Sequence, residues 1–228
     1  IIDLSQDYRD ESNGFVYGLP EVNRERIKKA TKLANPGCFA TAIQIGLLPL
    51  AAAGLLKNEI HTNGITGSTG AGVKPGATSH FSWRNNNISI YKAFTHQHLI
   101  EFGMTIRNLQ PSFDKDINFL PVRGDFSRGI YVSQYTECDL DEEAAIKLYK
   151  DFYKDSAFTF VMDKNPDLKQ VVNTNKGIVH VEKHGNKLLI ISMIDNLLKG
   201  ASGQAVQNFN LMFGLDEKMG LNLKSVAF

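Results

Sequence analysis

Residues 34–41 carry the sequence ANPGCFAT, which places Cys38, one of two cysteines in the chain, at a turn between a strand and a helix. Pro36 and Gly37 break the extended segment, and an apolar run with helical character follows over residues 41–56. A thiol at a helix N-terminus lies beside unpaired backbone N–H groups, at the positive end of the helix dipole. Such a setting lowers a thiol pKa and can hold an oxyanion, which predicts a nucleophile at Cys38. The alternative is a small buried side chain without chemistry, as most free cysteines are.

The composition is that of a globular protein with balanced charge. Of 228 residues, 43% are hydrophobic and 21% are charged, and the net charge is +1. This balance gives no reason to expect a nucleic-acid or membrane partner, and no uninterrupted apolar stretch reaches the length of about 18 residues that indicates a membrane span. Two cysteines are too few for a disulfide framework and suit a reducing compartment, so we expect a cytoplasmic protein.

Hydrophobic patterning predicts strands and packing helices, and therefore an α/β or α+β fold. Strands are expected within residues 1–4, 60–90, 89–94, 117–122, 129–138, 178–182 and 187–194. Helices are expected over residues 22–33, 38–56, 95–108, 139–156 and 201–213. The last strand is apolar on both faces, which predicts a central position in the sheet.

Three details of the predicted helices can be checked against the structure. Pro49 is expected to kink or break its helix. Asp139 or Asp141 is expected to cap the helix that follows. The last helix is expected to pack through its apolar stripe, which consists of Ala205, Val206, Phe209 and Met212.

A histidine pair, His96 and His98, is followed by Glu101 and forms a second candidate site. Histidine is the usual acid/base group near neutral pH, and a carboxylate can orient an imidazole. Residues two apart do not share a helix face, and no cluster with the spacing of metal ligands is nearby, so we expect no metal site. Structural or solvated histidines are the alternative.

Two further segments have the composition of ligand-binding loops. Residues 67–74 are rich in glycine but match neither the phosphate-binding P-loop nor the dinucleotide fingerprint. Residues 196–205 combine small side chains that let a ligand approach the backbone, although a plain strand-to-helix connection has the same composition. The candidate anion ligands are Lys74, Arg84, Arg123 and Arg128, each of which alone is more typical of a surface charge.

Taken together, these segments resemble the N-acetyl-gamma-glutamyl-phosphate reductases, which are relatives of aspartate-semialdehyde dehydrogenase. In chain order the similar motifs are DLSQDYR (3–9), YGLPE (17–21), NPGC (35–38), STGAG (68–72), HQH with Glu101 (96–101), RGI (128–130) and DNLLKGASGQAVQ (195–207). The match runs nearly end to end and implies the catalytic and dimerisation domain of the semialdehyde-dehydrogenase type. One departure is Gln97, which stands where the family has an arginine between the two histidines.

The resemblance implies a role for each matching residue. Cys38 is the nucleophile, His96 is the acid/base group, and Glu101 orients an imidazole. The residues implied to bind substrate are Ser68, Lys74, His98 and Arg128. The residues implied to meet the nicotinamide end of the cofactor are Asn196, Gly200 and Gly203.

The implied reaction is the NADPH-dependent reduction of N-acetyl-gamma-glutamyl phosphate to its semialdehyde, in arginine biosynthesis, with a thioester on Cys38 and release of phosphate. The family opens with a dinucleotide-binding unit, and this sequence resembles only its last part. We therefore expect residues 1–37 to be a remnant of that Rossmann domain, residues 38–198 to be the catalytic and dimerisation domain, and residues 199–228 to pack on the dinucleotide-binding domain. The expected partners are a small acyl phosphate and further copies of the chain, in a homodimer or homotetramer, and we expect the isolated chain to be inactive.

Three other functions remain open at this point. The first is an enzyme like aspartate-semialdehyde dehydrogenase, which shares the cysteine and histidine chemistry but fits the HQH and KGASGQA motifs less well. The second is a dimerisation module without catalysis. The third is a cysteine hydrolase, which needs the same pair of residues but no nucleotide.

Overall fold

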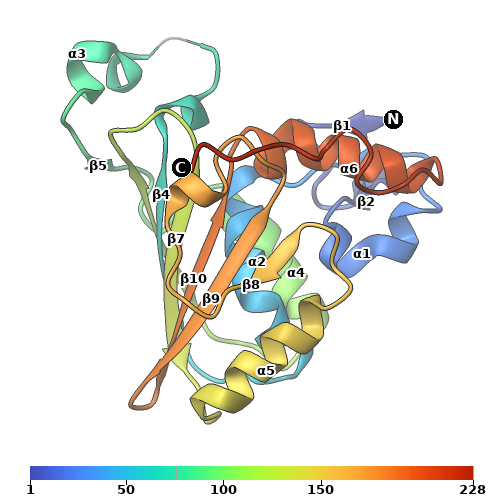
Figure 1. Ribbon diagram of the computed structural model, residues 1–228, viewed down its shortest axis with the longest axis vertical. Coiled ribbons are helices and arrows are strands. Elements are labelled where there is room, and N and C mark those ends of the chain that lie inside the picture. Colours follow the sequence, from blue (N-terminus) through green and yellow to red (C-terminus); the bar gives the residue numbers. More distant parts are fainter. Residues whose placement is uncertain (75, 228) are drawn as a thin grey trace.

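A seven-stranded mixed sheet lies at the centre of the computed structural model, which describes residues 1–74 and 76–227 (Figure 1). Its strands, in the order β5-β6-β4-β7-β10-β9-β8, are β4 (Ile60–Thr66), β5 (Ser89–Ile90), β6 (Ile117–Arg123), β7 (Ile130–Glu137), β8 (Thr159–Val161), β9 (Gly177–His184) and β10 (Lys187–Ile194). The pairs β4–β6 and β8–β9 are parallel, and the other pairs are antiparallel. The predicted mixed sheet is confirmed, and the apolar strand β10 is central, between β7 and β9.

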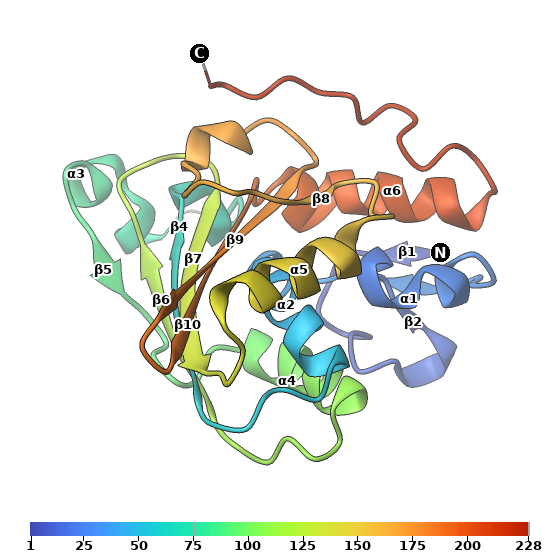
Figure 2. The same cartoon turned by 60° about the horizontal axis from the view of Figure 1, so that its bottom comes forward.

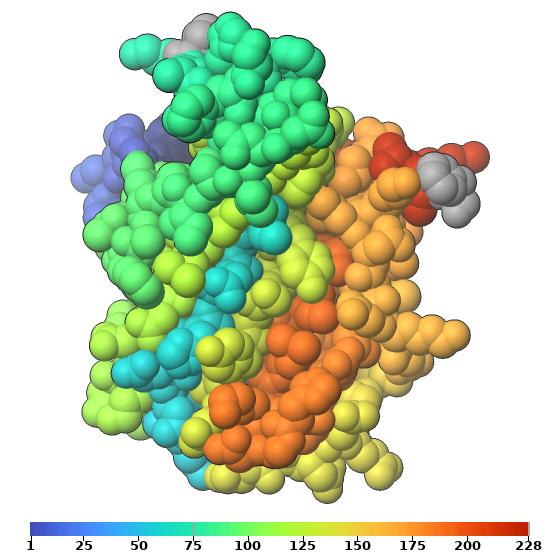
Figure 3. Space-filling view, turned by 90° about the vertical axis from the view of Figure 1, so that its left-hand side faces the viewer, coloured from blue at the N-terminus to red at the C-terminus, as the bar shows by residue number. Residues whose placement is uncertain are grey.

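The three longest helices cover one face of this sheet. They are α2 (Cys38–Ala52), α4 (His98–Leu109) and α5 (Glu142–Tyr153) (Figure 2). Along β7 the side chains of Ile130 and Val132 are buried beneath the helices, whereas Tyr131 and Tyr135 are half-buried on the opposite face. On that opposite face, shown in Figure 3, Val171 and Leu168 pack over Ile191 and Met193 of β10, and the rest of the face is open.

A smaller sheet of three short strands lies beside the helical layer. Its strands, in the order β1-β3-β2, are β1 (Ile2–Asp3), β3 (Leu33–Ala34) and β2 (Val16–Tyr17), and they run parallel. Helices α1 (Pro20–Ile27) and α6 (Gly203–Met212) pack around it through a small core in which Ile27, Leu33 and Leu211 are buried. The predicted helix over residues 22–33 is therefore too long, because its last residues form β3.

Short helical turns connect these elements. They are η1 (Ser12–Gly14), η2 (Ser68–Ala71), η3 (Ala77–Ser79), α3 (Phe81–Arg84), η4 (Leu168–Gln170) and η5 (Leu198–Ser202), of which η5 is a π-helical turn. Asp141 caps α5 by accepting a hydrogen bond from the N–H of Ala144, as expected. No helix within residues 1–74 and 76–227 combines the length and apolar character needed to cross a membrane.

The packing of α6 corrects the expected apolar stripe. Val206 and Phe209 are 41% and 42% exposed, and Met212 packs beside the buried Leu211, whereas the rest of the buried face consists mostly of amide side chains. Asn208 donates to the carbonyl of Gly18, and Gln204 donates to the hydroxyl of Thr41. Because this helix lies over a junction of turns and helix ends, amide side chains that satisfy polar partners replace an apolar contact.

Helix α2 corrects a second expectation, because it continues through Pro49 to Ala52. A proline has no N–H, so the carbonyl of Ile45, four residues earlier, loses its usual helical donor. The buried hydroxyl of Tyr153, on α5, donates to that carbonyl at 2.6 Å, and Tyr149 donates to the next carbonyl along. The proline is tolerated because a side chain distant in sequence supplies the missing hydrogen bond.

This explanation predicts that Tyr153→Phe lowers the free energy of unfolding by about 1–3 kcal/mol, since the Ile45 carbonyl then stays buried without a donor. Urea unfolding measures the loss. Tyr8→Phe is the matched control, because no hydrogen bond of the Tyr8 hydroxyl exists among the described residues, and it should change stability by less than about 0.5 kcal/mol. In a Pro49→Ala background, which restores an N–H, the cost of Tyr153→Phe should shrink; an unchanged cost would contradict the explanation.

Candidate active site

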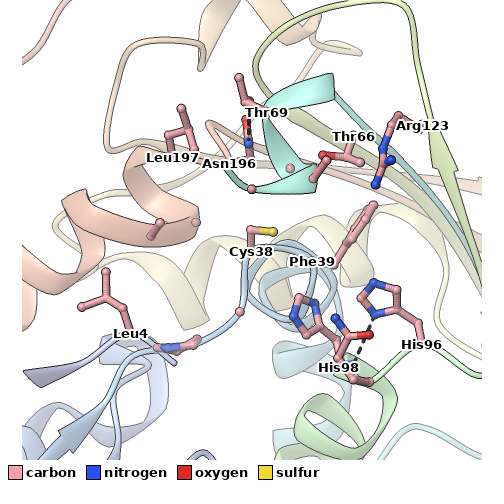
Figure 4. A pocket seen from close by; sticks show the side chains of 18 of the residues that line it. Leu4, Cys38, Phe39, Thr66, Thr69, His96, His98, Arg123, Asn196 and Leu197 are labelled. Carbon is pink, nitrogen blue, oxygen red and sulfur yellow. Dashed lines mark hydrogen bonds between the residues drawn. The ribbon is translucent and has the colours of Figure 1, made fainter. Parts of the chain in front are cut away.

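A pocket of about 520 Å3 opens between the small sheet, the head of α2 and one end of the main sheet. Cys38 is the first residue of α2, directly after the N-cap Gly37. Figure 4 shows Cys38 between the rings of His96 and His98 on one side and Asn196 on the other. The pocket therefore brings the predicted nucleophile, both histidines and the loop after β10 together.

The chain approaches Cys38 closely on two sides. A Cβ atom on Gly200 would lie 2.8 Å from the Cβ of Cys38, so only glycine lets η5 pack this near. A side chain at Gly37 would collide with His98 and Arg9. The two glycines thus let His98, Arg9 and η5 pack directly against the backbone around the thiol.

The pKa of the Cys38 thiol is raised, whereas the sequence predicted a lowered one. Burial raises the pKa of Cys38 to about 11, and the N–H groups of Phe39 and Cys38 offset only part of this effect. The helix N-terminus is present as predicted, but the loss of water around the sulfur outweighs it. The resting group is a thiol, and a thiolate requires a base or a change in its surroundings.

The two imidazoles are neutral and differ in their hydrogen bonds. Burial lowers the pKa of His96 to about 4, and burial together with the neighbouring His96 lowers that of His98 well below its usual value. The backbone N–H of His98 donates to Nδ1 of His96 at 3.2 Å, which leaves the proton of neutral His96 on Nε2. The guanidinium of Arg9 lies 3.5 Å from Nε2 of His98, and Nδ1 of His98 is buried without a partner among the described residues.

Glu101 does not bond either imidazole directly, contrary to the predicted role. Its carboxylate accepts from the N–H of Gly37 at 2.7 Å, from the hydroxyl of Tyr17 at 2.7 Å and from Arg9 at 3.3 Å. Burial raises the pKa of Glu101, although Arg9 and the N–H of Gly37 counteract it. The carboxylate thus fixes the turn before Cys38 and reaches His98 only through Arg9.

Three of the predicted substrate residues lie outside the pocket lining. Lys74 is exposed, and Ser68 begins η2 without lining the cavity. Arg128 forms an ion pair at 2.9 Å with Asp195, whose carboxylate is fully buried. The charge of Arg128 is therefore used inside the protein.

Some residues of the loop after β10 line the pocket, and others pack against neighbouring parts of the chain. Asn196 and Gly200 line the pocket, but the amide of Asn196 accepts from the N–H of Gly129 and donates to the hydroxyl of Thr69. Gly203 does not line the pocket, because it packs against the side chain of Asn175. Asn196 therefore holds the glycine-rich loop in place instead of presenting its amide to a ligand.

Four residues that line the pocket were not predicted as ligands from the sequence, namely Arg9, Thr66, Tyr91 and Lys92. Arg123, which also lines it, was predicted only as one of four candidate cations. Arg123 ends β6 and pairs in register with Thr66 at the end of the parallel strand β4. Parallel strands end at the same edge of a sheet, which is the signal that could have selected Arg123 among the candidate cations. Arg84, another candidate, is buried and donates to the carbonyls of Thr78, Asn87 and Arg123.

The charged groups around the pocket all have one sign. Of the described residues that line it, Arg9, Lys92 and Arg123 are cationic, and none is aspartate or glutamate. Within residues 1–74 and 76–227, no group of three or more His, Cys, Asp or Glu side chains could hold a metal ion. The arrangement suits a small anionic ligand that contacts a thiol.

Comparisons with known proteins agree with this fold and identify the family. The family model described as "Semialdehyde dehydrogenase, dimerisation domain" matches residues 38–196, which identifies the class. Proteins named N-acetyl-gamma-glutamyl-phosphate reductase from Azobacteroides pseudotrichonymphae and Parabacteroides distasonis are 67% and 63% identical over 100% of this chain and 71% of each relative. The chain belongs to the N-acetyl-gamma-glutamyl-phosphate reductase family.

Solved structures support the fold independently of sequence. Aspartate semialdehyde dehydrogenase II from Vibrio cholerae matches with a TM-score of 0.71 at 17% identity, over 93% of this chain and 72% of that chain. A probable aspartate-semialdehyde dehydrogenase from Pseudomonas aeruginosa matches with a TM-score of 0.69 at 16% identity and the same coverage. The predicted fold of the semialdehyde-dehydrogenase type is confirmed.

The raised pKa of Cys38 leads to a prediction about how fast the thiol reacts. With a pKa of about 11, only about one Cys38 in a thousand is a thiolate at pH 8, so alkylation by iodoacetamide should keep accelerating up to about pH 11. Mass spectrometry of the labelled peptide measures the rate, and Cys38→Ala isolates the labelling of Cys138. A plateau below pH 8 would show that the thiolate forms without a ligand and would contradict the burial argument.

Proposed function

We propose that this chain supplies the catalytic part of an enzyme that reduces N-acetyl-gamma-glutamyl phosphate to its semialdehyde, releasing phosphate, in arginine biosynthesis. The observation that carries the proposal is Cys38 at the head of a helix, in a pocket lined by two neutral histidines and three cations without an acid. The names of the relatives support the substrate. We place the reaction in the cytoplasm, with NADPH as reductant.

In the proposed reaction, Sγ of Cys38 attacks the acyl carbon, the bond from that carbon to the phosphate oxygen breaks, and a thioester forms on Cys38. The N–H groups at the start of α2 stabilise the oxyanion on the acyl oxygen. A bound nicotinamide would supply the hydride that reduces the thioester carbon. The bond between that carbon and the Cys38 sulfur then breaks, the sulfur takes back a proton, and the semialdehyde is released.

His96 is the proposed acid/base group. Its resting tautomer, with the proton on Nε2, is suited to donate to the departing group. Accepting the proton of Cys38 requires the other tautomer, in which the bond from the N–H of His98 is given up. His98, fixed through Arg9 and Glu101, stays beside the turn as a substrate contact.

We propose that a nicotinamide cofactor lies at one wall of the pocket. The residues Gly200 and Ala201 line the pocket beside Cys38, and their small size would let the cofactor approach the backbone. We propose that residues 1–37 belong to a dinucleotide-binding domain, that residues 38–198 form the catalytic and dimerisation domain, and that residues 199–228 pack on the first part. The contact of α6 with the small parallel sheet supports this division.

We also propose that two copies of the chain pair through the open face of the main sheet. The matching family model describes a dimerisation domain, and none of the long helices α2, α4 and α5 covers this face (Figure 3). Half-buried aromatic and apolar side chains lie along its strands, among them Tyr131, Tyr135 and Leu189. These side chains would lose their remaining contact with water in a dimer.

The chemical step is tested with Cys38→Ser in the complete enzyme. Turnover should fall by about 1,000-fold or more, because a hydroxyl is a far weaker nucleophile than a thiolate, while Cys138→Ala should keep most of the activity. In wild-type protein given the acyl phosphate without NADPH, intact mass should increase by the acyl group. Substantial activity of Cys38→Ser would rule out the thioester, and ester hydrolysis without a nucleotide would indicate a hydrolase instead.

The interface is tested with Leu189→Glu, which places a charge on the open sheet face. Analytical ultracentrifugation should show a shift from dimer towards monomer, because the carboxylate must lose water to enter the interface. Ile100→Glu is the matched control, since Ile100 is 78% exposed on α4. A dimer unaffected by Leu189→Glu would place the interface elsewhere.

A further inference from the structure

Arg123 differs from the other arginines near the pocket in having no acidic partner among the described residues. Arg9 is paired with Glu101, and Arg128 is paired with Asp195. Lys92 also lines the pocket without a carboxylate partner, but its side chain is exposed and donates to the side-chain oxygen of Gln97. Of the two lining cations whose charge no carboxylate offsets, Arg123 is the one that other side chains hold in place.

The guanidinium of Arg123 is held in place but incompletely bonded. It lies over the ring of Tyr91, with 4.7 Å from its central carbon to the ring centroid, and one terminal nitrogen donates weakly to the hydroxyl of Thr78 at 3.4 Å. Its Nε is buried and has no hydrogen-bond partner among the described residues. Stacking on an aromatic ring fixes the plane of an arginine while leaving its edge free to donate.

The direction of this side chain points to its ligand. Figure 4 shows Arg123 reaching into the pocket beside Thr66, above Phe39 and on the side where His96 lies. A guanidinium can donate two parallel hydrogen bonds to an oxyanion, which makes such a pair stronger than a neutral hydrogen bond. An oxyanion in the pocket would be bound by the terminal nitrogens of Arg123, since its Nε is buried.

We propose that Arg123 is the anion-binding residue of this pocket and that it binds an oxyanion of the substrate, either the phosphate or the carboxylate, through its planar edge. The assignment rests on the proposed function for the identity of the substrate, but the anion site itself depends only on the described contacts. It replaces Lys74 and Arg128, which the sequence indicated and which the structure places outside the pocket. Arg123 thereby positions the acyl group relative to Cys38.

The test uses the complete enzyme in the direction that consumes the semialdehyde, in which inorganic phosphate and the semialdehyde are separate substrates. Arg123→Gln should raise the KM for one of them by about tenfold to a hundredfold, the range expected for a charged hydrogen bond, and leave the other within about twofold. A rise for phosphate assigns the phosphate subsite, and a rise for the semialdehyde assigns the carboxylate subsite. Arg123→Lys keeps the charge but loses the planar edge. Its KM for the affected substrate should lie between the values of the wild type and of Arg123→Gln.

Arg107→Gln is the matched control, because Arg107 is exposed on α4 and does not line the pocket; it should change neither KM. Thermal unfolding of each variant checks that the fold is intact. If Arg123→Gln leaves both KM values unchanged in an active enzyme, the proposal about Arg123 is wrong while the proposed function stands. If the wild type does not turn over, titration with inorganic phosphate and with N-acetylglutamate decides: binding that Arg123→Gln weakens supports the anion site, and binding that it does not alter, or no binding, overturns it.

Discussion

The buried carboxylate of Glu101 joins the parts of the chain that must meet for the site to exist. It accepts from Gly37 in the turn before Cys38, from Tyr17 in the small sheet and from Arg9 in the first loop. The hydroxyl of Tyr17 accepts in turn from the side-chain amide of Gln44, which lies in the second turn of α2. Because a buried carboxylate without these donors would be strongly destabilising, its burial couples the small sheet, α2 and α4.

A second buried ion pair also joins distant parts of the chain. Glu21 at the start of α1 and Lys199 in η5 lie 2.8 Å apart, and both are almost fully buried. Burial alone would raise the pKa of Glu21, but Lys199 and the hydroxyl of Thr159 hold it below its usual value. Lys199 is therefore structural: it anchors η5, whose Gly200 packs directly against Cys38. Such a pair adds little net stability compared with apolar packing, but it defines where η5 can lie.

Local patterns in the sequence predicted the main elements and brought Cys38, His96 and His98 forward as candidates that the structure places in one pocket, whereas pairing between distant residues was out of reach. The apolar strand β10, the cap at Asp141 and the turn at Cys38 each depend on neighbouring residues, and the structure has them as expected. The continuation of α2 through Pro49 depends on Tyr153, which lies more than a hundred residues along the chain from Ile45.

Which of the candidate cations is free to bind an anion also depends on contacts between distant residues. Arg123 and Arg128 look alike in sequence, and only the buried Asp195 beside Arg128 separates them. The pKa of Cys38 likewise follows from how completely the surrounding elements exclude water, which no local motif reports. Local sequence therefore supplies the candidate reactive groups, and tertiary packing sets their charge states.

In the proposed reaction, the resting charges of the pocket would let a thiol with a high pKa act as the nucleophile. Cys38 and both histidines are uncharged, and the charged side chains that line the pocket are cations. Such a thiol would resist oxidation and alkylation in the absence of substrate. The proposed anionic substrate would be drawn towards the cations, which would bring its acyl carbon to the sulfur. Proton transfer from Cys38 would then accompany its attack on that carbon, so the proposed mechanism needs no standing thiolate.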